Sequence, residues 1–165
     1  MCTIRQAMEG DYPAICDLIT SKSELFRIYP RGSYPFTIEQ LSQLAKSRQD
    51  LTVVIQDDAV VGFANLYDVE PDNRAFVGNV IVSVDLRGRG IGRQLMQYMV
   101  KLAFVQYRPM SVAVSVFSDN IPALLLYTDL GFKPYAVERR IDPEGKPAAL
   151  IHMHIDSKGE HARVY

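Results

Sequence analysis

A glycine-rich segment flanked by arginines carries the clearest chemistry in the sequence. It alternates three glycines with three arginines: Arg87, Gly88, Arg89, Gly90, Gly92 and Arg93. Glycine lets the backbone turn tightly and lets an anion approach the main chain. An apolar run with strand character precedes the segment, and an apolar pattern with helical spacing follows it. Because the first N–H groups of a helix are unpaired and lie at the positive end of its dipole, this arrangement predicts a phosphate site.

The spacing of the glycines tests which kind of phosphate site this segment could form. A structural turn with solvated arginines would have the same composition and stays an alternative. A Walker loop requires lysine and then serine or threonine after its last glycine, and Arg93 and Gln94 stand there instead. A dinucleotide fingerprint has two residues between its last two glycines, where this chain has only Ile91. It also needs an acidic residue about 20 positions later, where Arg108 and Pro109 stand. The spacing therefore disfavours both nucleotide sites.

Two signatures taken together resemble those of the GNAT superfamily of N-acetyltransferases. The first, Arg87-Gly-Arg-Gly-Ile-Gly92, is similar to the family's Gln/Arg-x-x-Gly-x-Gly/Ala loop, which binds the coenzyme A diphosphate. The second, Asn120-Ile-Pro-Ala-Leu-Leu-Leu-Tyr127 followed by Gly131-Phe132, resembles the family's Asn-x-x-Ala-x-x-x-Tyr-x-x-x-Gly-Phe. The two occur in the family's order and separation, and the pattern of strands and helices fits from about Thr3 to Ile155.

The resemblance implies that acetyl-coenzyme A (acetyl-CoA) is bound as a cosubstrate, and it assigns roles to individual positions. Backbone groups of Val82 and Val84, at the end of a strand, would pair with the pantetheine arm. Asn120 would hydrogen-bond the same arm, although capping of the following helix is equally good chemistry for it. The residues implied to hold the pyrophosphate are Arg87, Arg89, Gly90, Gly92 and Arg93.

Acetyl transfer needs a neutral amine, donors for the oxyanion of the tetrahedral intermediate, and a proton for the leaving thiolate. The resemblance implies that the N–H of Val82 or its neighbour serves the oxyanion and that Tyr127 is the general acid. A phenol with an ordinary pKa of about 10 is protonated at neutral pH, so it can donate. The alternative for Tyr127 is an aromatic ring that only packs on its helix face.

The general base is the missing part of this machinery. Relatives that acetylate protein N-termini place a glutamate five residues before the asparagine of the second signature, where this chain has Ser115. Asp68 and Glu70, at the end of an earlier strand, are the nearest carboxylates by topology, and they suit a solvated hairpin equally well. A water relay, or an amine that arrives neutral, would need no protein base.

The resemblance implies that the acceptor is an amine of a small molecule or of a protein, and the sequence does not separate the two. Such folds build the acceptor wall between the first two helices, so Tyr29 and Tyr34 are candidate acceptor residues. Asp68 and Glu70 would favour a cationic acceptor. Because no base is recognisable, the alternative function is a regulatory module that binds acyl-CoA without turnover.

The histidines of the C-terminal region raise the question of a metal. His152 and His154 alternate with Met153, so both project from one face of a strand. A metal site needs further ligands, and no spacing in the sequence supplies them. We therefore predict no metal.

Apolar periodicity defines the elements that must position these residues. Asp11 can cap a first helix and Thr37 can open a second one as a capping box, whereas residues 21–36 show no helical period. Two further helices are predicted, over Ile91–Leu102 and between Asn120 and Gly131. The predicted strands are Thr3–Arg5, Leu51–Ile55, Val60–Val69, Phe76–Val84, Val112–Val116, Lys133–Ile141 and Ala149–Ile155.

These elements predict an α/β fold with α+β character, forming a single domain over residues 1–165. We expect a mixed, mostly antiparallel sheet of about seven strands flanked by about four helices, which is the GNAT fold. A net charge of −1 gives no reason to expect nucleic acid as a partner. No apolar run reaches the roughly 18 residues of a membrane span.

The cysteines and the N-terminal region bear on where the protein is located, and the C-terminal strands bear on whether it forms a homodimer. Cys2 and Cys16 have no metal-like spacing, and the charged N-terminal region lacks the apolar core of a signal peptide, so we expect a cytoplasmic protein. A homodimer would follow if the C-terminal strands left an apolar edge or face for a second copy. The residues of that surface would be Val137, Leu150, Ile151 and Ile155.

Overall fold

The computed structural model describes residues 1–158, whose seven strands form one sheet in the order β1-β2-β3-β4-β5-β7-β6. The pairs β1–β2, β2–β3, β5–β7 and β6–β7 are antiparallel, and the predicted fold class is confirmed. The strands are β1 (Cys2–Gln6), β2 (Gln49–Gln56), β3 (Ala59–Glu70), β4 (Arg74–Val82), β5 (Ser111–Phe117), β6 (Lys133–Ile141) and β7 (Pro147–Asp156). The helices are η1 (Glu9–Asp11), α1 (Tyr12–Asp17), α2 (Lys22–Ile28), α3 (Ile38–Ala45), η2 (Val84–Leu86), α4 (Ile91–Tyr107) and α5 (Ile121–Leu130).

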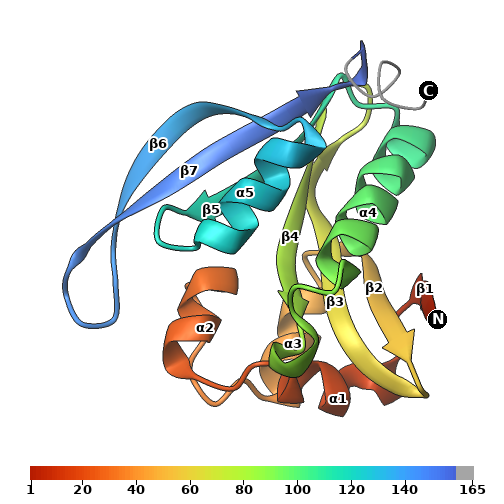
Figure 1. Cartoon of the computed structure of the whole chain (residues 1–165), viewed down its shortest axis with the longest axis vertical. Helices are drawn as coiled ribbons and strands as arrows, with labels where there is room; N and C mark the ends of the chain where they lie inside the picture. Colours follow the sequence, from red (N-terminus) through yellow and green to blue (C-terminus); the bar gives the residue numbers. More distant parts are fainter. Residues whose placement is uncertain (159–165) are drawn as a thin grey trace. The chain divides into compact units, whose positions relative to one another are not determined.

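The chain divides into two compact units, and Figure 1 traces its course through both. The first unit comprises Met1–Tyr67 and Val77–Met99, and so contains β1, β2, α1–α3, most of β3 and β4, and the start of α4. The second comprises Asp68–Phe76 and the chain from Val100 onward, with β5, α5, β6 and β7. None of the helices within residues 1–158 is long and apolar enough to cross a membrane.

Helices α1–α3 bury their apolar faces on one side of the strands of the first unit. One cluster of buried side chains joins these helices to Val53 of β2, Phe63 of β3 and Ile81 of β4. Three apolar residues within and just after α1 belong to this cluster: Ile15, Leu18 and Ile19. Removing this apolar surface from water is what holds such short helices in place, since isolated helices of this length are marginal.

Helix α2 occupies residues for which the sequence pattern predicted no helix. Its N-cap is Ser21, whose hydroxyl accepts a hydrogen bond from the Glu24 N–H at 3.1 Å. Helix α3 begins at Thr37 as predicted, because the Thr37 hydroxyl accepts from the Gln40 N–H at 3.3 Å. The capping box is only half formed, since the Gln40 side-chain oxygen accepts from the Ser33 N–H instead. The helices flanking the sheet are therefore more numerous than predicted.

Asp11 does not cap α1 with its side chain, so that prediction was wrong. Its carboxylate instead accepts two hydrogen bonds from the Arg5 guanidinium, at 2.7 and 2.8 Å, and a third from the Met8 N–H at 2.7 Å. The oxygens that would have capped α1 are therefore used to fasten η1 to the end of β1.

The second unit is built on β5, β7 and β6. β5 pairs with β7 from Ser111 opposite Asp156 to Phe117 opposite Leu150, and β6 pairs with the other edge of β7. The β6–β7 hairpin extends past the end of β5, and every residue of β6 is exposed (Figure 1).

The apolar surface expected on the C-terminal strands is smaller than predicted. Leu150 and Ile155 are buried within the chain at 8% and 7% exposure, and Ile151 is half-buried. Val137, at 69% exposure, is the one of the four that faces solvent. Leu150 and Ile155 are an odd number of residues apart, so they lie on opposite faces of β7, and both faces are covered there.

Candidate functional site

The glycine-rich segment forms a loop between β4 and the N-terminus of α4, as predicted. β4 ends at Val82, η2 follows, and α4 begins at Ile91 and runs for 17 residues. Gly88 and Gly90 have φ of 76° and 84°, in the region that favours glycine. A Cβ at either position would meet nothing within 4 Å, so these glycines serve the backbone conformation, and the loop is open to solvent above them.

Val84 lies outside β4, so its predicted place at the strand end was wrong. The Ser83 N–H donates to the Val61 carbonyl at 2.8 Å, and the chain then turns, with the Leu86 N–H bonded to the Ser83 carbonyl at 3.0 Å. Val84 therefore begins η2, with an exposure of 48%. Since the Ser83 N–H is already bonded, it is not an available oxyanion donor, and Val82 is the better of the two predicted positions.

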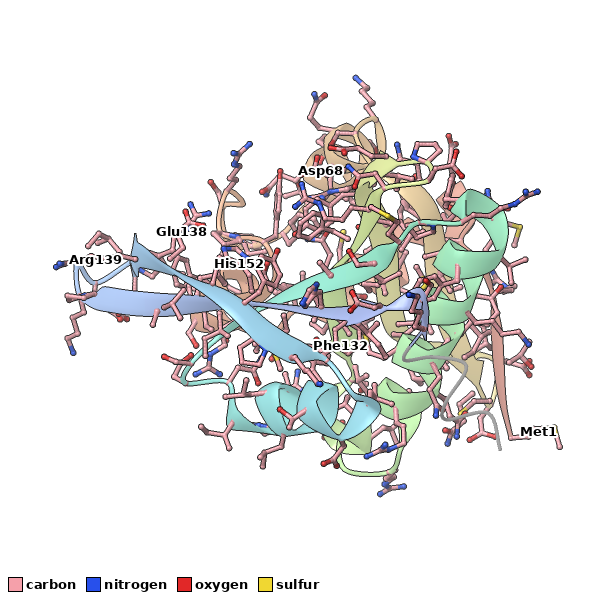
Figure 2. All side chains as sticks on the ribbon, turned by 90° about the horizontal axis from the view of Figure 1, so that it is seen from above. Met1, Asp68, Phe132, Glu138, Arg139 and His152 are labelled. Carbon is pink, nitrogen blue, oxygen red and sulfur yellow. The ribbon has the colours of Figure 1, made fainter. Side chains whose placement is uncertain are left out.

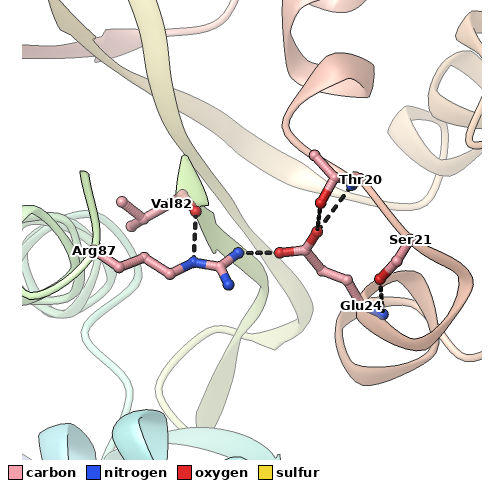
Figure 3. A network of polar contacts seen from close by, with 5 residues as sticks. All are labelled: Thr20, Ser21, Glu24, Val82 and Arg87. Carbon is pink, nitrogen blue, oxygen red and sulfur yellow. Dashed lines mark hydrogen bonds and ion pairs between the residues drawn. The ribbon is translucent and has the colours of Figure 1, made fainter. Parts of the chain in front are cut away.

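Arg87 is held at the centre of a polar network in the first unit (Figure 3). Its Nε donates to the Val82 carbonyl at 3.0 Å, and its guanidinium forms an ion pair with the carboxylate of Glu24 in α2. Glu24 also accepts hydrogen bonds from the Thr20 N–H at 2.9 Å and from the Thr20 hydroxyl at 3.0 Å. The guanidinium has five N–H donors, so these two contacts leave donors for an anion.

Sequence reasoning missed Glu24, which is the carboxylate in contact with the predicted phosphate loop. Burial opposes its ionisation, but hydrogen bonds from the Thr20 N–H, Arg87 and the Thr20 hydroxyl outweigh that cost and lower its pKa. The signal that would have found it is the pattern Ser21-x-x-Glu24, an N-terminal helix signature inside a segment without helical period.

The two aromatic residues predicted for the acceptor wall differ in their surroundings. The Tyr34 hydroxyl donates to the Thr20 carbonyl at 3.1 Å, so it adjoins the Glu24–Arg87 network. Tyr29 packs edge-on against Phe36, with the ring centroids 5.9 Å apart. It also lines an apolar cavity of about 10 Å³, which is too small for an acceptor. The structure therefore brings Tyr34, and not Tyr29, to the polar network.

The second signature lies in the second unit, at both ends of α5. Asn120 is the N-cap residue by position, but its side chain makes no capping hydrogen bond. Gly131 ends the helix with φ of 99°, as predicted. Tyr127 is buried at 5% exposure, with its ring centroid 6.0 Å from that of Phe132. Burial raises the pKa of Tyr127, which keeps the phenol protonated.

Asp68 and Glu70 lie at the exposed end of β3, in the second unit. Glu70 accepts a hydrogen bond from the Asn73 side chain, and the Asn73 N–H is bonded to the Glu70 carbonyl at 3.0 Å. Glu70 therefore stabilises the turn between β3 and β4. This arrangement favours the alternative of solvated turn residues over a general base.

A chain of hydrogen bonds crosses β5, β7 and β6 in the second unit. The Ser115 hydroxyl lies 2.7 Å from Nδ1 of His152, and Nε2 of His152 lies 3.1 Å from a carboxylate oxygen of Glu138. Figure 2 labels His152 and Glu138 on neighbouring strands of the hairpin. The sequence pattern placed His152 on one face of its strand, but the register that puts Ser115 opposite it comes only from strand pairing. Within residues 1–158, no three histidine, cysteine or acidic residues are arranged to hold a metal ion.

Comparisons with known proteins agree with this geometry. The sequence model of the acetyltransferase (GNAT) family matches residues 12–132. An SPbeta prophage-derived uncharacterized N-acetyltransferase, YokL, of Bacillus subtilis (strain 168) is 26% identical over 113 residues. That match covers 68% of this chain and 64% of the relative, less than two thirds of the relative's length.

Solved structures share the fold across nearly the whole chain. Spermidine N-acetyltransferase from Vibrio cholerae, in complex with CoA and spermine, superposes with a TM-score of 0.80 at 19% identity, over 96% of each chain. The ribosomal-protein-S18-alanine N-acetyltransferase from Escherichia coli superposes with a TM-score of 0.74 at 21% identity, over 94% of each chain. With the family match covering both signatures, the chain belongs to the acetyltransferase (GNAT) family.

Proposed function

We propose that the protein is an N-acetyltransferase that moves an acetyl group from acetyl-CoA to a primary amine. The observation that carries the proposal is the open loop before α4, where two glycines with positive φ and exposed arginines adjoin the helix N-terminus. Unpaired N–H groups and guanidinium groups there would bind the diphosphate. The residues proposed to do so are Arg87, Arg89, Gly90, Gly92 and Arg93.

The pantetheine arm would contact backbone groups at the end of β4, and Asn120 would donate or accept a hydrogen bond with the same arm. Because the Asn120 side chain makes no capping bond, its amide is not committed to α5. Arg87 already bonds the Val82 carbonyl, so we assign to Val82 chiefly an N–H role toward the oxyanion. Val84, on η2, would contribute only if the arm reaches beyond the strand.

The reaction would be a direct attack of the amine on the thioester carbon through a tetrahedral intermediate. Tyr127 would give its proton to the sulfur as coenzyme A leaves. Burial keeps that phenol protonated, which suits a general acid. The two cysteines are free thiols, Cys2 and Cys16, and this fits a reducing compartment such as the cytoplasm.

The acceptor would be a small-molecule amine or a protein amine. The structural neighbours named above act on spermidine in one case and on a ribosomal protein in the other. In this chain Glu24 and the Tyr34 hydroxyl adjoin each other through Thr20. This polar network would suit a cationic group of the acceptor.

The test is turnover, measured as release of free coenzyme A thiol from acetyl-CoA in the presence of single amines. The panel should contain spermidine, a peptide that begins with alanine, and a lysine-containing peptide. Thiol release that depends on one amine, with the acetylated amine found by mass spectrometry, is the expected result. Acetyl-CoA binding without turnover on any amine would instead support the alternative, a regulatory module that binds acyl-CoA.

A further inference from the structure

We propose that His152 is the general base of the transfer and that it takes the amine proton through the hydroxyl of Ser115. The proposal rests on the proposed function and deepens it, because the sequence offered no base. All of its residues lie in the second unit, on the strands β5, β7 and β6. β5 leads directly into Asn120 and α5, which carries the proposed acid Tyr127.

The three side chains of the relay meet because of strand register. Ser115 is paired with His152 across β5 and β7, and Ala136 is paired with His152 across β6 and β7. The Ser115 oxygen and Nδ1 of His152 are 2.7 Å apart, and Nε2 of His152 is 3.1 Å from Glu138. The His152 side chain is 20% exposed and Ser115 is half-buried, so neither side chain is sealed off from solvent.

The partners of His152 determine which ring nitrogen carries the proton. An ionised carboxylate only accepts hydrogen bonds, so Nε2 must carry the hydrogen that faces Glu138. In the neutral imidazole Nδ1 is then unprotonated and accepts from the Ser115 hydroxyl. The Ser115 oxygen consequently keeps a lone pair for a proton that arrives from outside. This is the tautomer that a base needs, and Glu138 is the residue that selects it.

The proton transfer balances without any further reactant. As the amine nitrogen bonds to the acetyl carbon, its N–H bond breaks, and the electron pair stays on nitrogen. The proton goes to the Ser115 oxygen, while the proton of the Ser115 hydroxyl goes to Nδ1 of His152. Ser115 ends as a neutral hydroxyl, and His152 ends as an imidazolium beside Glu138. The imidazolium later loses its extra proton to water. The leaving thiolate takes its proton from Tyr127, as proposed above, and the resulting phenolate regains a proton from water.

Two other interpretations of the same contacts predict different behaviour. Ser115 could be a nucleophile, but it lies inside β5 and not on a sharp turn, where nucleophilic serines are presented next to oxyanion donors. The hydrogen bonds could also serve only to join the strands. His154 provides the comparison, because it lies on the same face of β7, opposite Ala113, which has no hydroxyl.

The charged and titratable groups around His152 come from two of the three strands. Glu138 of β6 also pairs with Arg140 at 3.1 Å, and the Tyr135 ring of β6 lies 6.0 Å from the imidazole. On β7 itself, the His154 ring lies next to the same Tyr135 ring, and the two ring centroids are 4.9 Å apart. β5 contributes only the neutral Ser115.

The experiment compares His152→Gln, Ser115→Ala and Glu138→Gln with the matched control His154→Gln. Turnover at neutral pH should fall by about 10²–10⁴-fold in His152→Gln, as for a lost general base. The loss should shrink at high pH, where hydroxide can take the amine proton instead of the relay. Ser115→Ala should show the same pH dependence, and His154→Gln should match the wild type. Glu138→Gln should lower turnover less than His152→Gln does, because a glutamine oxygen can still accept the hydrogen bond from Nε2. Affinity for coenzyme A should be unchanged in all four variants.

Unchanged turnover and an unchanged pH profile in His152→Gln would overturn the proposal while leaving the proposed function intact. An acetyl group found covalently on Ser115 would overturn it in favour of the nucleophile. If the wild type transfers acetyl to no amine, the proposed function and this inference fail together. Independently of activity, nitrogen NMR of the free protein should show His152 with its proton on Nε2, and a proton on Nδ1 would contradict the relay.

Discussion

The guanidinium of Arg87, in the loop before α4, is paired with the carboxylate of Glu24 in α2, a residue 63 positions earlier in the chain. The same guanidinium is bonded through Nε to the carbonyl that ends β4. Fixing a flexible arginine in advance reduces the side-chain entropy that is lost when an anion binds. The pair therefore links the helix that carries the Glu24 network to the loop proposed to hold the diphosphate.

Replacement of Arg87 by alanine should weaken binding of coenzyme A. Loss of one charge-assisted hydrogen bond costs about 1.5–3 kcal/mol, which is a factor of roughly ten to a hundred in affinity. Calorimetric titration measures this, with Arg139→Ala as the control, because Arg139 is exposed on β6. Unchanged affinity in Arg87→Ala, and also in Arg89→Glu, would show that the loop does not hold the diphosphate.

Glu24→Gln should lower stability at neutral pH and much less in acid. The pKa of Glu24 is lowered in the folded chain, so its ionised form stabilises the fold above the unfolded pKa of about 4.3. That stabilisation is lost as the pH falls through the folded pKa. Denaturant unfolding at pH 7 should show a difference of about 1–2 kcal/mol between wild type and variant. At a pH of about 3 the two curves should approach each other.

The control for this effect is Glu144→Gln, which removes an exposed glutamate from the β6–β7 turn. It should leave the free energy of unfolding close to that of the wild type at neutral pH. A difference for Glu24→Gln that is as large in acid as at pH 7 would mean that side-chain size, and not charge, causes the loss.

Local signals in the sequence were sufficient for most of the fold. Alternating valines in β5, helical spacing in α4 and the glycine that ends α5 each depend on neighbouring residues only, and the structure has all three. The loop before α4 was also predictable, because its glycine spacing is local. Helix α2 was missed because Leu25 is its one fully buried residue, so no apolar period marks it.

The relationships that matter most for the site were not predictable, because they join distant parts of the chain. Glu24 meets Arg87 only after α2 has packed, and Ser115 meets His152 only when β5 and β7 pair in one register. Asp11 was predicted to be an N-cap because the N-cap preference depends only on the residues that follow it. In the structure its carboxylate is bonded to Arg5, which lies before it in β1. A single sequence contains the residues of such pairs but not the register that joins them.

Gly88→Ala should destabilise the loop although there is room for the added methyl group. A Cβ at Gly88 would meet nothing within 4 Å, but φ there is 76°. A left-handed conformation costs a residue with a Cβ about 1–2 kcal/mol. Gly10→Ala is the matched control, since its Cβ also meets nothing and its φ is outside the left-handed region. Thermal unfolding and coenzyme A titration should both be affected in Gly88→Ala only, and equal melting temperatures would contradict the strain argument.

We expect the protein to pair with itself through β6, whose exposed apolar residues include Tyr135 at 46%, Val137 at 69% and Ile141 at 55%. A strand that is exposed along its whole length offers unpaired backbone groups and apolar area to a second copy. Light scattering at micromolar concentration should give twice the chain mass of 18.6 kDa, and Val137→Lys should return it to the monomer. A monomer for the wild type would exclude this arrangement.

Tyr127→Phe should separate chemistry from packing at the proposed general acid. Tyr127 follows Asn120 by seven residues, about two helical turns, so we expect both side chains on the same side of α5. The substitution keeps the ring, which is 5% exposed and lies against Phe132, so stability should change little. Affinity for coenzyme A should also survive, because the diphosphate contacts are assigned to the loop before α4.

The quantity that should fall is the rate of the chemical step, by about 10²–10⁴-fold, as for other lost general acids. Burial raises the pKa of Tyr127, so the phenol of the wild type stays protonated at mildly alkaline pH. The wild-type rate of the chemical step should therefore not fall there through ionisation of Tyr127. Single-turnover measurements with saturating acetyl-CoA isolate this step from product release. Full single-turnover activity in Tyr127→Phe would show that Tyr127 has only a packing role. The thiolate would then take its proton from water.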